Sequence, residues 1–525
     1  MTAVLLNGLV GVPVAFALLA WVMGRRPGAA LGTAVTGGVV TFGWSVWLAV
    51  AAAPALGADR VDVAWVESLG VRWHLGVDGI SLPLVLMTTL VAGCSLLSLL
   101  RQAPASAEGG PDRRVSLAVL LLVIEAGVLG CFSALDMVLF FLFFEVALIP
   151  MWFVINSWGD RHDPVGRRKA ATRFLVFTVT GSALMLVGFL VVGSSAGTFD
   201  IVRIAATYHP SGSTALLASV LVALGLAVKT PLWPLHIWLP DAHSKAPTVG
   251  SVLLAAVLLK LGTYGFVRFW MPLTDPAWPL LVPVVAALAV VGIVYAALAC
   301  LAQRDLKRLI AYSSVGHMGF VLLAVATFTL GGVQAAVYAS VAHGLITGLL
   351  FFLAGGIKDR YDTSELARLT VLYGRLPRLA GLFAFAAMAS LGLPGLAGFW
   401  GEMLSIRSAV FSSAALPRAT FVVLGVIAAF GVILTTAYFL ALVRGMLQGT
   451  PAAAVPVNPD VESVELASRE VEPGSDAVEP VQHDVRPMEW AAWSPLVALT
   501  LLFGVAPGLL LGPVGQAARA FFGGL

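Results

Sequence analysis

Five charged residues and two histidines stand inside long apolar stretches of this sequence. A charge buried in hydrocarbon costs about 3 kcal/mol or more, so such residues are usually retained for ion or proton transfer. Carboxylates, amines and imidazoles can all bind and release protons, and the chemistry that this set predicts is therefore proton transfer. The seven residues are Glu125, Glu145, Lys229, Lys260, His317, His343 and Glu402.

Four of the seven have an ordinary structural interpretation as well. A buried lysine can pair with a carboxylate, a glutamate can cap a helix or form an ion pair, and a histidine can be a hydrogen-bonded packing residue. These alternatives apply to Lys260, Glu125, His317 and His343. No packing role explains Glu145, Lys229 or Glu402, so these three are the strongest candidates for function.

The elements that position these residues are membrane-spanning helices. The chain has 525 residues, of which 59% are hydrophobic and 11% are charged, against about 25% charged in soluble domains. Apolar runs of this length can cross about 30 Å of hydrocarbon as helices. The sequence therefore predicts an all-α polytopic membrane protein with about fourteen transmembrane helices, at 2–23, 29–53, 79–100, 115–133, 135–158, 170–193, 213–238, 246–270, 278–301, 306–328, 331–356, 377–406, 418–446 and 490–512.

Two of these spans contain helix-breaking residues beside a charge. The seventh has Pro231 and Pro234 just after Lys229, and the twelfth has Pro394 and several glycines before Glu402. Broken helices in membranes typically mark ion sites. The two breaks lie five spans apart, which is an odd number, so the paired spans cross in opposite directions. Spans 4–8 and 9–13 are therefore predicted to form two inverted five-helix repeats.

The predicted organisation has five regions. An N-terminal three-helix region covers 1–114, the two repeats cover 115–270 and 271–447, and the last helix lies within 490–525. Between them, residues 448–489 contain nine acids and no apolar periodicity, which predicts a flexible acidic linker. The linker could be a tolerated insertion or a segment that docks on a partner.

Lys and Arg are distributed unevenly between the two sets of loops. If Arg25 and Arg26 are cytoplasmic, that side holds 22 basic residues and the opposite side holds seven. The positive-inside rule then places both termini on the outer face of the membrane. The first span lacks a positive segment before it, so we expect it to be retained rather than cleaved. The 25 arginines against 6 lysines favour a bacterial source, and hence a multi-pass protein of the bacterial inner membrane.

Several functional classes are excluded by composition. A net charge of +3 gives no basic surface for nucleic acid. The three cysteines (Cys94, Cys131 and Cys300) are isolated, and no dinucleotide fingerprint or phosphate-binding loop is present. The sequence therefore predicts no metal or cofactor in this chain, and any redox chemistry or ATP hydrolysis that drives it belongs to another chain.

Four motifs resemble a known family, the antiporter-like subunits of respiratory complex I. They are Val228-Lys-Thr-Pro-Leu-Trp-Pro-Leu-His with its continuation through His243 to Pro247, Leu259-Lys-Leu-Gly-Thr-Tyr-Gly, Asp305-Leu-Lys-Arg-Leu-Ile-Ala-Tyr-Ser-Ser-Val-Gly-His317, and Gly398-Phe-Trp-Gly-Glu402. The resemblance covers about residues 80–450. It implies a fourteen-helix fold with two inverted five-helix repeats. In this family the ionisable residue of the twelfth span is usually lysine, but in the M-type branch it is glutamate, as here.

The resemblance also implies roles for the candidate residues. Glu145 and Lys229 would form the inner pair of one half-channel, Lys260 would be the central relay, and Glu402 would accept protons on the exit side. His317 and His343 would line the polar axis between them, and Glu125 stays an additional candidate.

The function implied is that of a proton-translocating membrane-arm subunit of NADH:quinone oxidoreductase. NADH, FMN, iron–sulfur clusters and quinone would then bind to partner subunits, and other antiporter-like subunits would be neighbours in the lipid bilayer. The alternative is a subunit of a multi-chain Mrp-type cation/proton antiporter, which has no redox coupling. Glu402 counts against this alternative.

Overall fold

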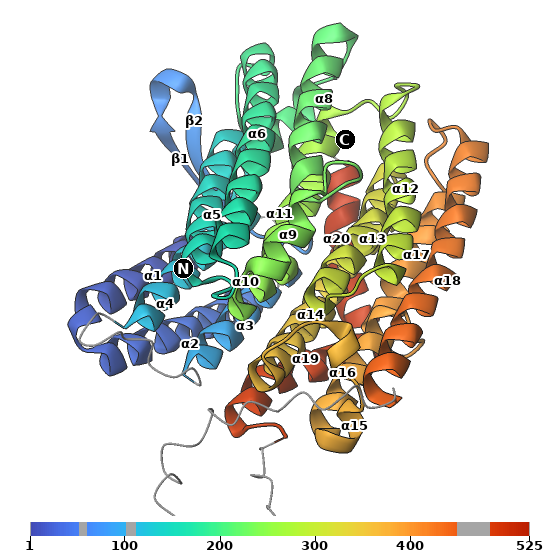
Figure 1. The fold of residues 1–525 in the computed structure, drawn as a ribbon. Coiled ribbons are helices and arrows are strands. Elements are labelled where there is room, and N and C mark those ends of the chain that lie inside the picture. The colour runs from blue at the N-terminus through green and yellow to red at the C-terminus, as the bar shows by residue number, and fades with distance from the viewer. Residues whose placement is uncertain (1, 52–59, 101–111, 449–483, 524–525) are drawn as a thin grey trace, which may run out of the picture.

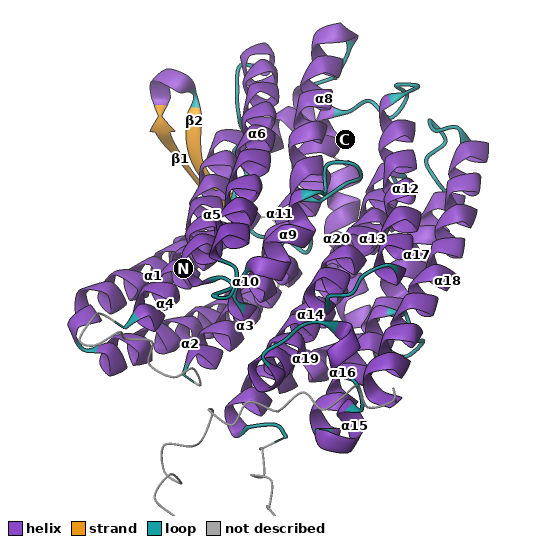
Figure 2. Cartoon of the chain, in the orientation of Figure 1, coloured by secondary structure: helices purple, strands orange, loops and turns teal. Residues whose placement is uncertain are grey.

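The computed structural model describes residues 2–51, 60–100, 112–448 and 484–523, and nearly all of them lie in helices (Figure 1, Figure 2). Thirteen helices in this described part are long and apolar enough to cross a membrane. The predicted class of an all-α polytopic membrane protein is therefore confirmed. One feature was not predicted, a β-hairpin that is drawn in orange in Figure 2.

The N-terminal region contains three long helices and this hairpin. Strands β1 (Arg60–Val66) and β2 (Val71–Gly76) pair antiparallel, with Arg60 opposite Gly76. The helices are α1 (Thr2–Val22), α2 (Pro27–Ala51) and α3 (Leu82–Leu99).

The next region runs from α4 to α11 and holds the first four charged candidates. Its helices are α4 (Arg113–Ser133), α5 (Met137–Trp158), α6 (Pro164–Ala196), α7 (Ile201–Thr207), α8 (Gly212–Lys229), α9 (Trp238–Lys245), α10 (Thr248–Leu253) and α11 (Leu259–Gly265). A wider π-helical turn at Leu254–Leu258 joins α10 to α11, and a second one at Phe266–Trp270 continues this span beyond α11.

The remaining helices, α12 to α20, form the rest of the bundle. They are α12 (Leu281–Leu301), α13 (Leu306–Ala326), α14 (Leu330–Tyr361), α15 (Leu372–Arg375), α16 (Pro377–Ser390), α17 (Ala397–Val410), α18 (Arg418–Gln448), α19 (Pro487–Val505) and α20 (Gly508–Gly523). The predicted linker lies mostly outside the described residues. Its last residues do not, because α19 already begins at Pro487.

A helix ends at each of the two predicted breaks, and another helix begins several residues later. Helix α8 ends at Lys229 and α9 begins at Trp238, while α16 ends at Ser390 and α17 begins at Ala397. The prolines remove backbone donors at these points, and Gly392 and Gly395 adopt positive φ angles of 82° and 92°. The inverted relation between the two predicted repeats stays a prediction.

The spans that carry Lys260 and His343 form the core. The span Thr248–Leu273 and helix α14 are buried along their whole apolar windows, whereas the outer helices expose much of their surface. Close packing is possible because small residues meet: a Cβ added to Gly344 would lie 2.9 Å from the carbonyl oxygen of Ala256. The polar residues of the core are therefore shielded from the surrounding lipid by other helices.

Loops that are predicted to lie on the same side of the membrane meet at the same end of the helix bundle. At one end, Lys245 Nζ lies 2.7 Å from Asp163 and 3.5 Å from Asp160, and Lys358 Nζ lies 3.6 Å from Asp160. The hydrogen bonds to Lys245 and to the backbone amide of Gly166 hold the pKa of Asp163 below its ordinary value. These ion pairs join the α5–α6 loop to the ends of α9 and α14.

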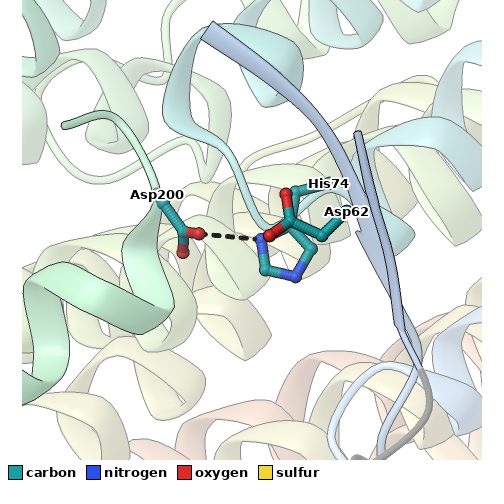
Figure 3. Close-up of side chains that lie close together, drawn as sticks. All are labelled: Asp62, His74 and Asp200. Atoms are coloured by element: carbon teal, nitrogen blue, oxygen red, sulfur yellow. Dashed lines mark hydrogen bonds and ion pairs between the residues drawn. The ribbon is translucent and has the colours of Figure 1, made fainter. Parts of the chain in front are cut away.

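The hairpin is anchored at the other end by buried polar residues. His74 Nδ1 lies 3.0 Å from Asp200 Oδ2, with Asp62 beside them (Figure 3). Burial raises the pKa of Asp200, but its hydrogen bonds with His74 and with backbone amides outweigh burial and lower the pKa below its ordinary value. Ligand atoms of these three residues lie within 4.8 Å of one another. Arg72 and Arg203 already pair with the two carboxylates, so the cluster is an ion-pair network and not a cation site.

Candidate functional site

Lys229 and Glu145 face each other without a direct bond. Lys229 is the last residue of α8, where the helix dipole favours a positive charge, and it is 1% exposed. Its Nζ lies 4.8 Å from the ring centre of Phe144 and has no hydrogen-bond partner in the described residues. It interacts electrostatically with Glu145 of α5, whose Oε1 is also buried and unpaired in this part of the chain. The two charges are thus close but not locked together.

Lys260 is held by a histidine and a carbonyl group. Its Nζ donates to Nδ1 of His343 at 2.6 Å and to the carbonyl oxygen of Ala255 at 2.6 Å. Lys260 is fully buried, and the π-helical turn that precedes it is of a kind found frequently at functional sites. Neither of these two partners is a carboxylate, the partner that the alternative structural interpretation of Lys260 requires. A proton shared between an amine and an imidazole is the arrangement that a relay requires.

His317 and Glu402 form the next contact. Nδ1 of His317 lies 3.2 Å from Oε1 of Glu402, and its Nε2 lies 3.0 Å from the hydroxyl of Ser390. The first contact is close enough for an ion pair but does not form a hydrogen bond, so Oε1 keeps no hydrogen-bond partner in the described chain. The rings of His317 and His343 are 5.5 Å apart.

The break between α16 and α17 is what brings Glu402 to this position. Gly392 lies at the turn with a positive φ, and a Cβ there would be 2.8 Å from Oε2 of Glu402. Helix α17 also packs closely against its neighbours, since a Cβ on Gly401 would lie 3.0 Å from Ala339. The glycines of the twelfth span therefore position the carboxylate.

Four of the seven predicted residues thus form one row. They come from four different predicted spans, one of which is the broken twelfth span, and all are buried or nearly so. In order along the row they are Lys260, His343, His317 and Glu402. The pair of Glu145 and Lys229 lies apart from this row. Glu125 is 1% exposed and neither of its carboxylate oxygens has a hydrogen-bond partner in the described residues, so the structure joins it to none of the others.

Polar residues that the sequence did not single out also line the site. His243 of α9 is fully buried, stacks on Phe351 at 4.5 Å, and lies close enough to interact with the charge of Lys260. Ser390 fixes the orientation of His317. His243 stands in the first motif quoted above, which could have indicated it, whereas a serine at a helix end carries no such signal.

Comparison with known proteins identifies the class. Residues 134–430 match the family described as "NADH:quinone oxidoreductase/Mrp antiporter, TM". The chain belongs to this family.

Two individual relatives indicate which branch of the family the chain resembles. The chain is 38% identical to NADH-quinone oxidoreductase subunit M of Rhodobacter capsulatus, over 98% of this chain and 95% of that one. It is 40% identical to NAD(P)H-quinone oxidoreductase chain 4 2 of Microcystis aeruginosa, over 74% of this chain and 68% of that one. The predicted resemblance to the M-type branch is confirmed.

Two solved structures share the fold. A chain of respiratory complex I from Thermus thermophilus with bound NADH matches with a TM-score of 0.81 and 29% identity, over 99% of each chain. A chain of the Mrp complex from Dietzia matches with a TM-score of 0.80 but 22% identity, over 99% of this chain and 98% of that one. At that identity the second match speaks for the fold alone.

Proposed function

We propose that this chain is a proton-translocating membrane-arm subunit of a multi-subunit NADH:quinone oxidoreductase. The names of the relatives support the complex, and the row from Lys260 to Glu402 in the buried core is the observation that carries the proton path. The chain would take part in the enzyme reaction through the complex and would hold no redox group itself. NADH, FMN, iron–sulfur clusters and quinone would bind to partner subunits.

The central step is a proton transfer through His343. A protonated lysine has only donors, so Nδ1 of His343 accepts from Lys260 and Nε2 carries the ring proton. When Lys260 gives its proton to Nδ1, the ring can release the proton at Nε2 toward Glu402. Lys260 becomes neutral and the carboxylate of Glu402 becomes neutral, so one positive charge has moved along the row.

Glu145 and Lys229 would act as the switch. A buried ammonium needs a nearby negative charge, because burial penalises the charged form. Lys229 has an electrostatic partner in Glu145 but no hydrogen bond that fixes the pair. If Glu145 moves away, Lys229 loses that stabilisation and can release its proton toward Lys260. His243, which lies close to Lys260, is placed to help this transfer.

The membrane orientation is also part of the proposal. The end that carries Lys245 and Lys358 would face the cytoplasm, and the hairpin would lie on the outer face with both termini. Other antiporter-like subunits of the same complex would be neighbours in the bacterial inner membrane. The Mrp-type antiporter is the less favoured function, because the Mrp match is lower in sequence identity and Glu402 replaces the lysine usual there.

Substitution of the switch residues tests this proposal. Glu145→Gln and Lys229→Ala should each lower proton pumping severely in membrane vesicles while the complex still assembles. Glu67→Gln and Lys169→Ala make the same chemical changes at exposed positions and should pump normally. Pumping at the control level in either switch variant would remove this pair from the mechanism.

A further inference from the structure

A small cavity is lined by both His343 and Glu402. It has a volume of about 30 Å³ and lies between α13, α14, α16 and α17. About 10–15 Å³ of such volume holds one water molecule, so the cavity has room for about two. Besides the two histidines and Glu402, the polar residues that line it are Ser390 and Thr347.

Three buried polar atoms of residues that line this cavity lack a hydrogen-bond partner in the described residues. They are Nε2 of His343, Oγ1 of Thr347 and Oε1 of Glu402. Thr347 is fully buried and stands four residues after His343 on α14, so the two side chains lie on the same face of the helix. Buried polar atoms are almost always paired, and a water molecule needs two to four such partners.

No direct hydrogen bond leads from Nε2 of His343 to another group in the described part of the chain. The rings of His343 and His317 are 5.5 Å apart, and both nitrogens of His317 already face other groups, Glu402 and Ser390. A proton leaving Nε2 of His343 therefore needs an intermediate acceptor.

We propose that Thr347 is a positioning residue of this path: its hydroxyl orients the one or two water molecules for which the cavity between His343 and Glu402 has room. The inference rests on the proposed function, since it supplies the missing link of that proton path. Water would accept the proton from Nε2 of His343 and pass one of its own to Glu402 Oε1. The water ends neutral, so the transfer balances. Thr347 itself neither gains nor loses a proton.

Three substitutions at Thr347 separate this role from packing. Thr347→Val keeps the shape but replaces the hydroxyl by a methyl group, so it should lower coupled proton pumping by about tenfold, as expected for a lost hydrogen bond at a buried site. Thr347→Ala also removes the hydroxyl, but it leaves space in which another water can restore the connection. Thr347→Ser keeps the hydroxyl. We therefore expect pumping to fall in the order Ser, Ala, Val.

A purely structural role predicts a different order. Valine would then be tolerated best and alanine worst, because a void in a packed core is destabilising. Thr41→Val is a matched control, since the buried hydroxyl of Thr41 is already satisfied by the carbonyl oxygen of Gly37 at 2.8 Å. Pumping should be measured in vesicles that contain the assembled complex, and it should be divided by the amount of complex.

The outcomes distinguish this inference from the proposed function. Loss of pumping in Thr347→Val with recovery in Thr347→Ala supports the water connection. Wild-type pumping in Thr347→Val, or a value for Thr347→Ala below that of Thr347→Val, overturns it. If Glu402→Gln loses pumping while Thr347→Val does not, the path stands and only the water connection is wrong. If Glu402→Gln pumps normally, the proposed path itself fails.

Discussion

Replacing Glu489 by alanine would remove the carboxylate that pairs with the buried guanidinium of Arg360. The two side chains are 2% and 6% exposed, and they form two parallel hydrogen bonds, Nη1 to Oε1 at 3.0 Å and Nη2 to Oε2 at 2.8 Å. Glu489 also accepts from the backbone amide of Arg486 at 2.8 Å, at the start of α19. This bond pattern ties the last transmembrane helix to the end of α14.

The cost can be worked out from these contacts. Removing one partner of a buried ion pair costs about 3–5 kcal/mol, and loss of a helix cap costs about 1 kcal/mol. Arg360 would keep its bonds to the carbonyl oxygens of Gly356 at 2.9 Å and Asp484 at 3.0 Å, so we expect a total near the lower limit. About 3 kcal/mol is a factor of more than 100 in the equilibrium constant for docking of α19.

Thermal denaturation of the purified complex would measure this effect. Glu489→Ala should lower the midpoint and the yield of complex, whereas Asp62→Ala, in the exposed Arg72–Asp62 pair, should change stability by at most about 1 kcal/mol. The double variant with methionine at both 360 and 489 should be more stable than Glu489→Ala, because it leaves no unpaired charge. Wild-type stability of Glu489→Ala, or a double variant no better than the single one, would refute the reasoning.

Three further predictions concern the linker, the hairpin and the helix break. Deleting 452–480 should leave assembly and pumping nearly intact on native gels, whereas Asp484→Ala should cost about 1 kcal/mol, since its carboxylate caps the first amides of α16. Because the pKa of Asp200 is lowered, its pairing with His74 stabilises the hairpin above about pH 4, and this stabilisation is lost as the pH falls through that pKa. Proteolysis of the hairpin should therefore become faster at low pH, and Asp200→Asn should remove this pH dependence. Gly392→Ala should reduce pumping, because its positive φ is strained for alanine and the added Cβ presses on the nearby carboxylate.

The candidate residues could be chosen from this one sequence, because the high cost of a charge in hydrocarbon marks Lys229, Lys260 and Glu402. Their arrangement could not be predicted. Lys260 and His343 are 83 residues apart, and nothing in either segment indicates that the two side chains touch. The structural interpretation of His317 as a hydrogen-bonded residue agrees with its contact to Ser390, whereas its role in proton transfer, beside Glu402, stays a prediction.

Other features were missed for physical reasons. Threonine and serine are common in transmembrane helices, so Thr347 and Ser390 gave no signal. The β-hairpin is short and stands among charged residues, and it is held by His74 and Asp200, which lie 126 residues apart. Residues 448–489 are acidic, and for this reason the sequence predicted a flexible linker up to residue 489. The last of these residues are nevertheless bound to the helix bundle, Asp484 by α16 and Glu489 by α14.

The most direct test of the proposed path is proton pumping by variants of Glu402. Its role requires a group that can bind and release a proton, so Glu402→Asp should keep partial activity and Glu402→Gln, which keeps the shape, should lose most of it. Both complex yield and quinone-coupled proton uptake must be measured, because a purely structural carboxylate would show its loss in the yield. Normal yield with sharply reduced uptake in Glu402→Gln is the predicted result. A Gln variant that assembles and pumps like the wild type would contradict the account.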